Sequence, residues 1–205
     1  EGTAGTEEIL HSDGVLFLSV DPSLDREKYT QHQAVRRPWW DEQPVQIRAV
    51  DAASGETLWI HVSPIMPLTL AADSQRVYFH DGEKLAALDR STGEPAWTSE
   101  PVARVKRVLS FFAPTLVVRD GVVLFAGGEE SGLVKSGGGA RKADTLTAVD
   151  AATGERLWTA DHPPSGYSSP EDLFVIGNTV WCEGVSSGGL PGEVVGYDLR
   201  TGEVR

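Results

Sequence analysis

Short runs of β-branched and aromatic residues recur along the chain, each introduced by turn-forming residues. They are "DGVLFL" (13–18), "DSQRVYFH" (73–80), "RDGVVLFAG" (119–127) and "GNTVWCEG" (177–184). Runs of this length and composition, bounded by Gly, Asn, Asp or Ser, are typical of β-strands. The pattern therefore predicts a chain built from strands rather than helices.

A second phrase follows each run: "IRAVDAASGETLW" (47–59), "LAALDRSTGEPAW" (85–97), "LTAVDAATGERLW" (146–158) and "VVGYDLRTGEVR" (194–205). In three units a third apolar element lies upstream, at 67–72, 114–118 and 170–176. Each full unit thus contains four strands joined by turns and one longer loop, which is the content of one propeller blade. We expect a single all-β domain over 1–205, with blades at 7–62, 63–101, 110–161 and 166–205, the last one incomplete.

The repeated residues have structural explanations. Each Asp side chain is expected to accept hydrogen bonds from the turn that follows it, and each Gly supplies the positive φ of a tight hairpin with a bulge. The Trp residues are expected to pack blade against blade. An aromatic platform for a cofactor is the competing interpretation of these Trp residues. The repeated set is Asp51, Gly55 and Trp59; Asp89, Gly93 and Trp97; Asp150, Gly154 and Trp158; and Asp198 with Gly202.

Apolar neighbours of the Trp residues, Leu58, Ala96 and Leu157, alternate with them along the last strand. Successive strand residues point to opposite faces of a sheet. This alternation predicts that the last strand is buried on both faces.

Composition narrows the classes of partner. The formal net charge is −12 and the basic residues are scattered, so the chain lacks the electrostatic footprint of a nucleic-acid-binding protein. Cys182 is the one cysteine, which excludes an intrachain disulfide and a cysteine-rich zinc site. No run approaches the roughly 18 apolar residues of a membrane span. Residues 1–8 lack the features of a signal peptide.

With the pattern Ala-x-Asp-x-x-Thr-Gly-x-x-x-Trp in view, the chain resembles the PQQ-like β-propeller repeats. The pattern is carried by Ala49 to Trp59, Ala87 to Trp97 and Ala148 to Trp158, whereas the fourth unit has Gly196 in place of the Ala. The family includes quinoprotein alcohol dehydrogenases and non-enzymatic propellers such as the outer-membrane assembly lipoprotein. The resemblance implies part of a seven- or eight-bladed ring, remaining blades from the rest of the protein, and an extracytoplasmic location.

For the dehydrogenases, the resemblance implies a calcium-held quinone, a catalytic Asp and a disulfide between adjacent cysteines. Here Cys182 stands alone, and no Asp, Asn and Glu set matches the calcium site. The five His residues show no metal-ligand spacing. We therefore assign no catalytic or metal-binding residue, and expect no cofactor to be required; PQQ and calcium enter by resemblance only.

Candidate binding residues gather in the longest insertions, at 21–44, 127–143 and 184–192 within blades and at 98–113 and 159–169 between them. Because neighbouring strands are antiparallel, all five insertions are expected on one face of the ring, the long-loop face. Arginines beside tryptophans suit flat or anionic ligands and protein hot spots. The alternatives are a self-packed loop plug and a solvated basic connector. The candidates are Arg36, Arg37, Trp39, Trp40, Arg104, Lys106, His162 and Tyr167.

Two functions follow from these observations. The first is a non-catalytic binding or scaffolding module, with a protein or small-molecule ligand on the long-loop face. The second is a segment of a PQQ- and calcium-dependent oxidoreductase whose active-site residues lie largely elsewhere in the protein.

Overall fold

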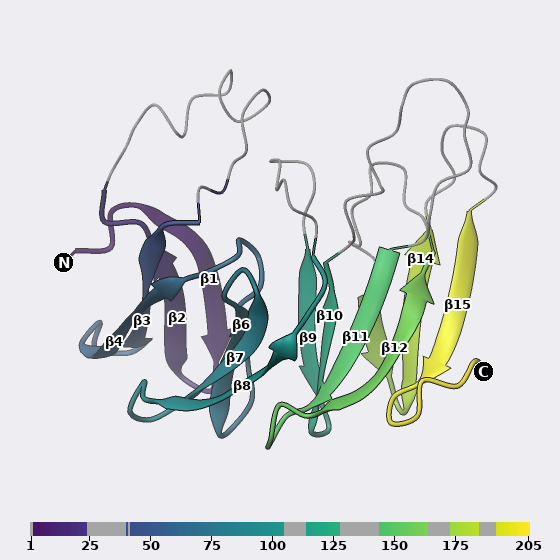
Figure 1. Ribbon diagram of the computed structural model, residues 1–205. Helices are drawn as coiled ribbons and strands as arrows, with labels where there is room; N and C mark the ends of the chain where they lie inside the picture. The colour runs from purple at the N-terminus through teal and green to yellow at the C-terminus, as the bar shows by residue number, and fades with distance from the viewer. Residues whose placement is uncertain are drawn as a thin grey trace.

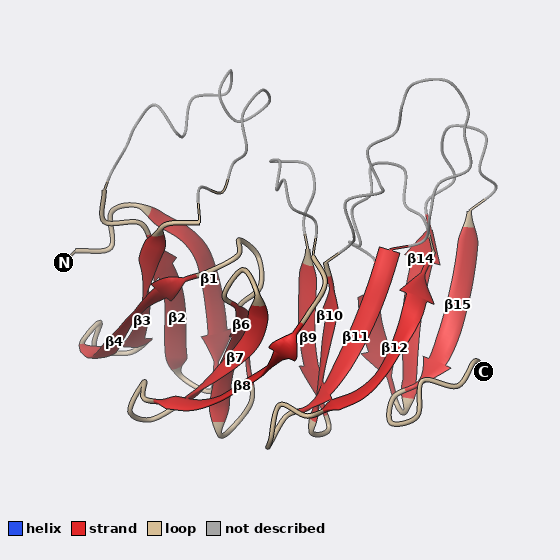
Figure 2. Cartoon of the chain, in the orientation of Figure 1, coloured by secondary structure: helices blue, strands red, loops and turns tan. Residues whose placement is uncertain are grey.

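A computed structural model describes residues 2–23, 40, 42–104, 114–127, 144–163, 173–184 and 192–205. These residues contain strands and no helix (Figure 2). The strands form four antiparallel sheets, which follow one another in chain order across Figure 1. The all-β propeller fold predicted from the repeat is confirmed.

The first two sheets, blades 1 and 2, have four strands each. Blade 1 contains β1 (Thr6–Ser12), β2 (Val15–Val20), β3 (Pro44–Asp51) and β4 (Thr57–Pro64). Blade 2 contains β5 (Ala71–Ala72), β6 (Arg76–His80), β7 (Lys84–Asp89) and β8 (Pro95–Pro101). In both sheets the spatial order of the strands is their order in the chain.

The other two sheets repeat this plan. Blade 3 contains β9 (Thr115–Arg119), β10 (Val122–Ala126), β11 (Asp144–Asp150) and β12 (Arg156–His162). Blade 4 contains β13 (Leu173–Ile176), β14 (Thr179–Gly184) and β15 (Glu193–Asp198), and a bridge between Tyr197 and Val204 follows its Gly turn. Neighbouring blades contact each other along their first strands, β1 to β5, β5 to β9 and β9 to β13.

Strand β1 is the first strand of blade 1, as β5, β9 and β13 are of the other blades. The sequence showed an apolar element at this place in the other three units but not in the first. Its sequence "TEEILHS" is mostly polar, yet it pairs with β2 from Ser12 opposite Val15 to Thr6 opposite Val20. Backbone hydrogen bonding to a neighbouring strand holds it in place, which an apolar pattern does not reveal.

Each Asp of the repeat organises its turn as expected. In all four turns its Oδ1 atom accepts the backbone N–H groups two and three residues on, at 2.7–3.1 Å. Hydrogen bonds from Ser54, Ser91 and Thr201 are the leading causes that lower the pKa values of Asp51, Asp89 and Asp198 respectively. The turn Gly residues have φ between 72° and 77°, a conformation that favours glycine.

The Trp of each blade packs on the Gly turn of the next blade. A Cβ built on Gly93, Gly154 or Gly202 would lie 2.5–2.7 Å from the ring of Trp59, Trp97 or Trp158 respectively. Each indole N–H also donates to the carbonyl of the residue that follows the turn Asp, at 2.9 Å to Arg90, 3.0 Å to Ala151 and 3.0 Å to Leu199. The expected blade-to-blade role of the three tryptophans is therefore observed.

The prediction that the last strand is buried on both faces is wrong. Trp59 and Trp158 are 8% exposed, but Leu58 is 51% exposed and Leu157 38%. The last strand lies at the outer edge of its sheet, where the interface between blades covers the Trp face and leaves much of the opposite face in solvent.

We predict that Trp158→Ala lowers the free energy of unfolding by about 3 to 5 kcal/mol, because it leaves a cavity above Gly202 and an unpaired carbonyl at Leu199. Urea denaturation measures the change. Leu157→Ala, on the opposite face of the same strand, is the matched control and is expected to cost about 1 kcal/mol or less. Equal losses in the two variants would contradict the packing role.

Candidate binding site on the long-loop face

The strand ends that flank the long insertions lie on one face of the propeller. Strands β2, β10 and β14 run toward this face, and β3, β11 and β15 start from it, because each pair is antiparallel. In Figure 1 the flanking ends of β10, β14 and β15 all point upward, opposite the Gly turns. The predicted grouping of the insertions on one face therefore agrees with the strand directions. Five of the candidate residues, Arg36, Arg37, Trp39, Lys106 and Tyr167, lie outside the described residues.

Trp40 is a buried wedge on this face. Its side chain is 6% exposed and belongs to an apolar cluster with Met66, Tyr78, Leu85 and Val102. It lies against Gly82 in the turn between β6 and β7, where a Cβ would come within 2.8 Å of the indole ring. The Nε1 atom is buried and has no hydrogen-bond partner among the described residues. Among the described residues, Trp40 therefore packs on the apolar core of the neighbouring blade 2, whereas the loop-plug alternative expects packing within the insertion itself.

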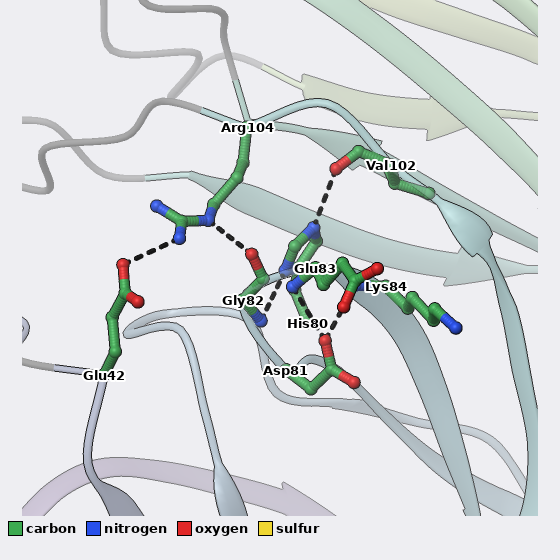
Figure 3. Close-up of polar contacts among 8 residues, drawn as sticks. All are labelled: Glu42, His80, Asp81, Gly82, Glu83, Lys84, Val102 and Arg104. Carbon is green, nitrogen blue, oxygen red and sulfur yellow. Dashed lines mark hydrogen bonds and ion pairs between the residues drawn. The ribbon is translucent and has the colours of Figure 1, made fainter.

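Arg104, in the connection that follows β8, contacts Trp40 and the turn on which Trp40 packs. Its Nε donates to the carbonyl of Gly82 at 2.6 Å, and Nη2 lies 2.8 Å from Oε1 of Glu42 (Figure 3). The guanidinium carbon lies 5.0 Å from the centre of the Trp40 ring, within the range of a cation–π interaction. The Arg104 side chain is 15% exposed and that of Glu42 58%. The sequence candidates Trp40 and Arg104 are thus in contact, and blades 1 and 2 are joined through them.

His80 is hydrogen-bonded to the same turn. It is fully buried at the end of β6, and its ring stacks on Phe125 of blade 3 at 4.6 Å between centroids. Its Nδ1 accepts the N–H of Gly82 at 2.9 Å, so the proton sits on Nε2, which donates to the carbonyl of Val102 at 3.3 Å. Burial lowers the His80 pKa from 6.5 to about 4. This imidazole is neutral near pH 7, and both its nitrogens are engaged with backbone groups.

His162, the remaining candidate, is the last residue of β12 in blade 3. It is fully buried, and Nδ1 lies 2.8 Å from the carbonyl of Pro163. A carbonyl only accepts, so Nδ1 carries the proton in this contact. The side chain is therefore engaged within its own blade.

Sequence reasoning did not find Glu42, Gly82 or His80, because their roles depend on which turns lie side by side. It also missed Glu8 on β1, whose Oε1 accepts the N–H of Leu70 of blade 2 at 3.0 Å. Burial raises the Glu8 pKa from 4.5 to about 7. The polar pattern of "TEEILHS" contains no signal that the carboxyl group of one of its two glutamates reaches the next blade.

A groove of about 700 Å³ lies on the opposite face, between the Gly turn of blade 2 and strands β2 and β4 of blade 1. Its lining includes Leu58, Ser74, Asp89, Arg90 and Ser91. The guanidinium of Arg90 donates within the protein, to the carbonyls of Ser12 at 2.6 Å and Asp73 at 2.9 Å. Arg90 therefore links blade 2 to the first hairpin of blade 1 through hydrogen bonds.

Calcium takes six to eight oxygen ligands, mostly carboxylates and carbonyls. The described residues bring together no group of three or more His, Cys, Asp or Glu side chains that could hold a metal ion. Glu8, with one oxygen on a backbone N–H of the next blade, stands apart from other carboxylates except its neighbour Glu7. Among the described residues there is no helix of the length and apolarity that crossing a bilayer requires.

The repeated blades and their Trp-on-Gly junctions define a β-propeller of PQQ-like repeats. The family model described as "Outer membrane protein assembly factor BamB" matches residues 45–205. The chain belongs to this family.

Solved structures with the same fold include BamB from Moraxella catarrhalis, at 17% identity and a TM-score of 0.55, over 93% of this chain and 48% of that one. The quinohemoprotein alcohol dehydrogenase from Comamonas testosteroni matches at 19% identity and a TM-score of 0.59, over 100% of this chain and 35% of that one. The quinohemoprotein alcohol dehydrogenase ADHIIG from Pseudomonas putida HK5 matches at 17% identity and a TM-score of 0.56, over 96% of this chain and 33% of that one. The chain thus spans less than half the length of these proteins. No curated protein matches it significantly.

We predict that the contribution of His80 to stability falls as the pH drops from about 6.5 to 4. The pKa of His80 is lowered in the folded state, so the unfolded chain takes up a proton first, and neutral His80 stabilises the fold only above this range. The loss reaches roughly 3 kcal/mol for a shift of this size. Urea denaturation at several pH values measures it.

His80→Gln is expected to remove this contribution, so that the stability of the variant relative to wild type rises as the pH falls from about 6.5 to 4, whereas His11→Gln, at an exposed position, shows no such change relative to wild type. Glu8 acts in the opposite direction, because its raised pKa favours the folded state as the pH falls from 7 toward 4.5. That contribution is common to wild type and variant and cancels in their difference. An unchanged slope in His80→Gln would contradict the assignment.

We predict that Arg104→Ala lowers the free energy of unfolding by about 1 to 3 kcal/mol, since it leaves the Gly82 carbonyl unpaired and uncovers Trp40. Thermal denaturation measures the loss. Arg119→Ala is the control, because its ion pair with Asp120 is exposed and contributes about 0.5 kcal/mol or less. An unchanged free energy of unfolding in Arg104→Ala would contradict a stabilising role for the contacts of Arg104 with Gly82 and Trp40.

Proposed function

We propose that this protein is a non-catalytic propeller that binds a partner through its long-loop face, with a protein as the preferred partner. The observation that carries the proposal is the clamp of Trp40, Glu42, Gly82 and Arg104. In this cluster the aromatic ring of Trp40 and the guanidinium of Arg104 are in contact with each other and with their neighbours. Its histidine neighbour, His80, is buried and hydrogen-bonded on both nitrogens, so it offers no general base.

The chemistry of the exposed rim supports a partner with basic groups. Glu42 is 58% exposed beside Arg104, and Glu83, which follows the Gly82 turn, is also exposed. The whole chain carries a formal net charge of −12. An acidic rim attracts a complementary basic surface and sets the rate of association.

The family description supports a role in assembly at the cell envelope. The family model carries the name of an outer membrane protein assembly factor, and it matches most of the chain. An extracytoplasmic protein that recruits other proteins is consistent with an acidic propeller whose variation is concentrated in the loops of one face. We extend to this chain both the envelope location and the protein partner.

We predict that charge reversal on the acidic rim weakens partner binding. Photo-crosslinking in envelope extracts with a probe at position 83 identifies the partner, whose affinity is then measured with purified proteins. Glu83→Lys is expected to weaken binding at least about tenfold. Glu203→Lys, exposed at a Gly turn on the opposite face, is the matched control.

An effect of Glu203→Lys equal to that of Glu83→Lys would place the binding surface elsewhere. The oxidoreductase alternative is tested by calorimetry of PQQ with calcium against the longest natural form of the protein. Tight, calcium-dependent binding would overturn the non-catalytic proposal, and no binding agrees with it.

A further inference from the structure

Two arginines of blade 2 line the groove of about 700 Å³ on the face of the Gly turns. Arg76 is the first residue of β6, and Arg90 follows Asp89 in the Gly turn. The residue paired with the turn Asp is Arg76 in blade 2, but in the other blades it is Val15, Val122 and Thr179. The residue after the turn Asp is Arg90 in blade 2, but in the other blades it is Ala52, Ala151 and Leu199. Blade 2 therefore departs from the repeat at two positions in one groove, and each departure adds a positive charge.

The first hairpin of blade 2 departs from the repeat at the same groove. In blades 1, 3 and 4 two residues separate the last paired residues of this hairpin. In blade 2 the last pair is Ala72 with Val77, and residues 73–76 lie between them. Ser74 and Gln75 of this longer turn line the groove too. Residues outside the repeat are not needed to build a blade, so their gathering in one groove indicates a site.

The two guanidinium groups are partly buried, and neither forms an ion pair with a carboxylate of the described residues. Arg90 donates to neutral acceptors, the hydroxyl and carbonyl of Ser12 at 3.2 and 2.6 Å and the carbonyl of Asp73 at 2.9 Å. Nη1 of Arg76 donates to Oε1 of Gln75 at 3.2 Å. Two guanidinium charges thus line this groove in a protein whose formal net charge is −12.

Asp89 also lines the groove and lies opposite Arg76 in the strand pairing, but its carboxylate is held by its own turn. Oδ1 accepts the hydroxyl of Ser91 at 2.6 Å and the N–H groups of Ser91 and Thr92 at 2.9 and 3.0 Å. The groove lining therefore has two positive groups and one negative group. The excess positive charge is available to an anion from outside the protein.

One wall of the groove is apolar. Leu58 of β4 is 51% exposed, and Val15 and Ala96 line the groove beside it. A cavity of this volume is in the range that small organic molecules occupy. A guanidinium group matches the geometry of a carboxylate or a phosphate, and an apolar wall shelters a hydrocarbon body from water.

We propose that this groove binds a small organic anion, whose carboxylate or phosphate group is held by Arg76 beside Arg90 and whose apolar body lies on Leu58. Arg76 supplies most of the direct hydrogen bonds, because Arg90 already donates to Ser12 and Asp73. Arg90 contributes mainly its charge. The site lies on the face opposite the long loops and is independent of the function proposed for them.

Calorimetry of the full chain with N-acetyl-leucine tests the site. A dissociation constant of the order of 1 mM is expected, and it is expected to rise with added salt. The uncharged N-acetyl-leucinamide is expected to bind at least about tenfold more weakly, because it lacks the carboxylate that Arg76 recognises.

Two further ligands separate the head group from the body. Hexyl phosphate, titrated alongside N-acetyl-leucine, shows which head group the arginines prefer, and saturable binding of either one supports the proposal. Inorganic phosphate has the charge without the apolar body. Leu58→Ala is expected to weaken the binding of N-acetyl-leucine about three- to tenfold and to leave that of inorganic phosphate unchanged.

Arg76→Ala is expected to weaken the binding of N-acetyl-leucine at least about tenfold. Arg119→Ala is the matched control, because Arg119 ends the first strand of blade 3 and is paired with Asp120. It is expected to leave binding unchanged. Arg76→Lys keeps the charge and loses the fork of donors, so it is expected to restore part of the lost affinity. Thermal denaturation of each variant verifies that it is folded.

Three outcomes would overturn the proposal. The first is no saturable binding of N-acetyl-leucine or hexyl phosphate at concentrations up to about 20 mM. The second is equal affinity for N-acetyl-leucine and its amide, which would leave no role for the charge. The third is an equal loss of affinity in Arg119→Ala and Arg76→Ala, which would indicate binding to scattered arginines rather than to this groove.

Discussion

Each blade is joined to the next by a tryptophan that lies flat on a glycine. The contact requires three conditions together: a positive φ at the glycine, no Cβ there, and a carbonyl at the correct height for the indole N–H. The Asp four residues earlier satisfies the first condition by binding two backbone N–H groups of the turn. Residues that look like a local turn signature are therefore the receiving half of a long-range interface. Spacing within the repeat is conserved between blades because both halves must form in register.

This constraint concerns one face of the propeller and leaves the other free to vary. The turns on the Gly face are short and alike, whereas the connections on the opposite face differ in length and composition between blades. The described residues of two of these connections, the one before β3 and the one after β8, contact each other where blades 1 and 2 meet. Trp40 inserts beside Gly82, and Arg104 bridges Gly82 and Glu42. On both faces an aromatic ring packs on a glycine: Trp59 on Gly93 at the Gly turns, and Trp40 on Gly82 on the long-loop face.

Fold and chemistry are separable in this family. The repeat residues are engaged in packing and turn formation, so they say nothing of substrate. His80 illustrates the point, because this histidine of blade 2 is a buried link between Gly82, Val102 and Phe125 rather than a reactive group. The binding role proposed for this protein therefore rests on side chains at the rim of the loops, where Glu42 and Glu83 are exposed.

The sequence by itself determined the strands, the blade repeat, the roles of Asp51 and Gly55 and their equivalents, and the packing role of the tryptophans. These depend on contacts within a few residues or on a pattern that recurs, and both are visible in a linear chain. It did not determine strand β1, which is held by pairing with β2 rather than by its own pattern. Only the tertiary structure decided that Trp40 meets Gly82 and Arg104, that Glu8 reaches Leu70, and that Leu58 stays exposed while Trp59 is buried. Such contacts join turns that are far apart in the chain, and no local spacing records which turns become neighbours.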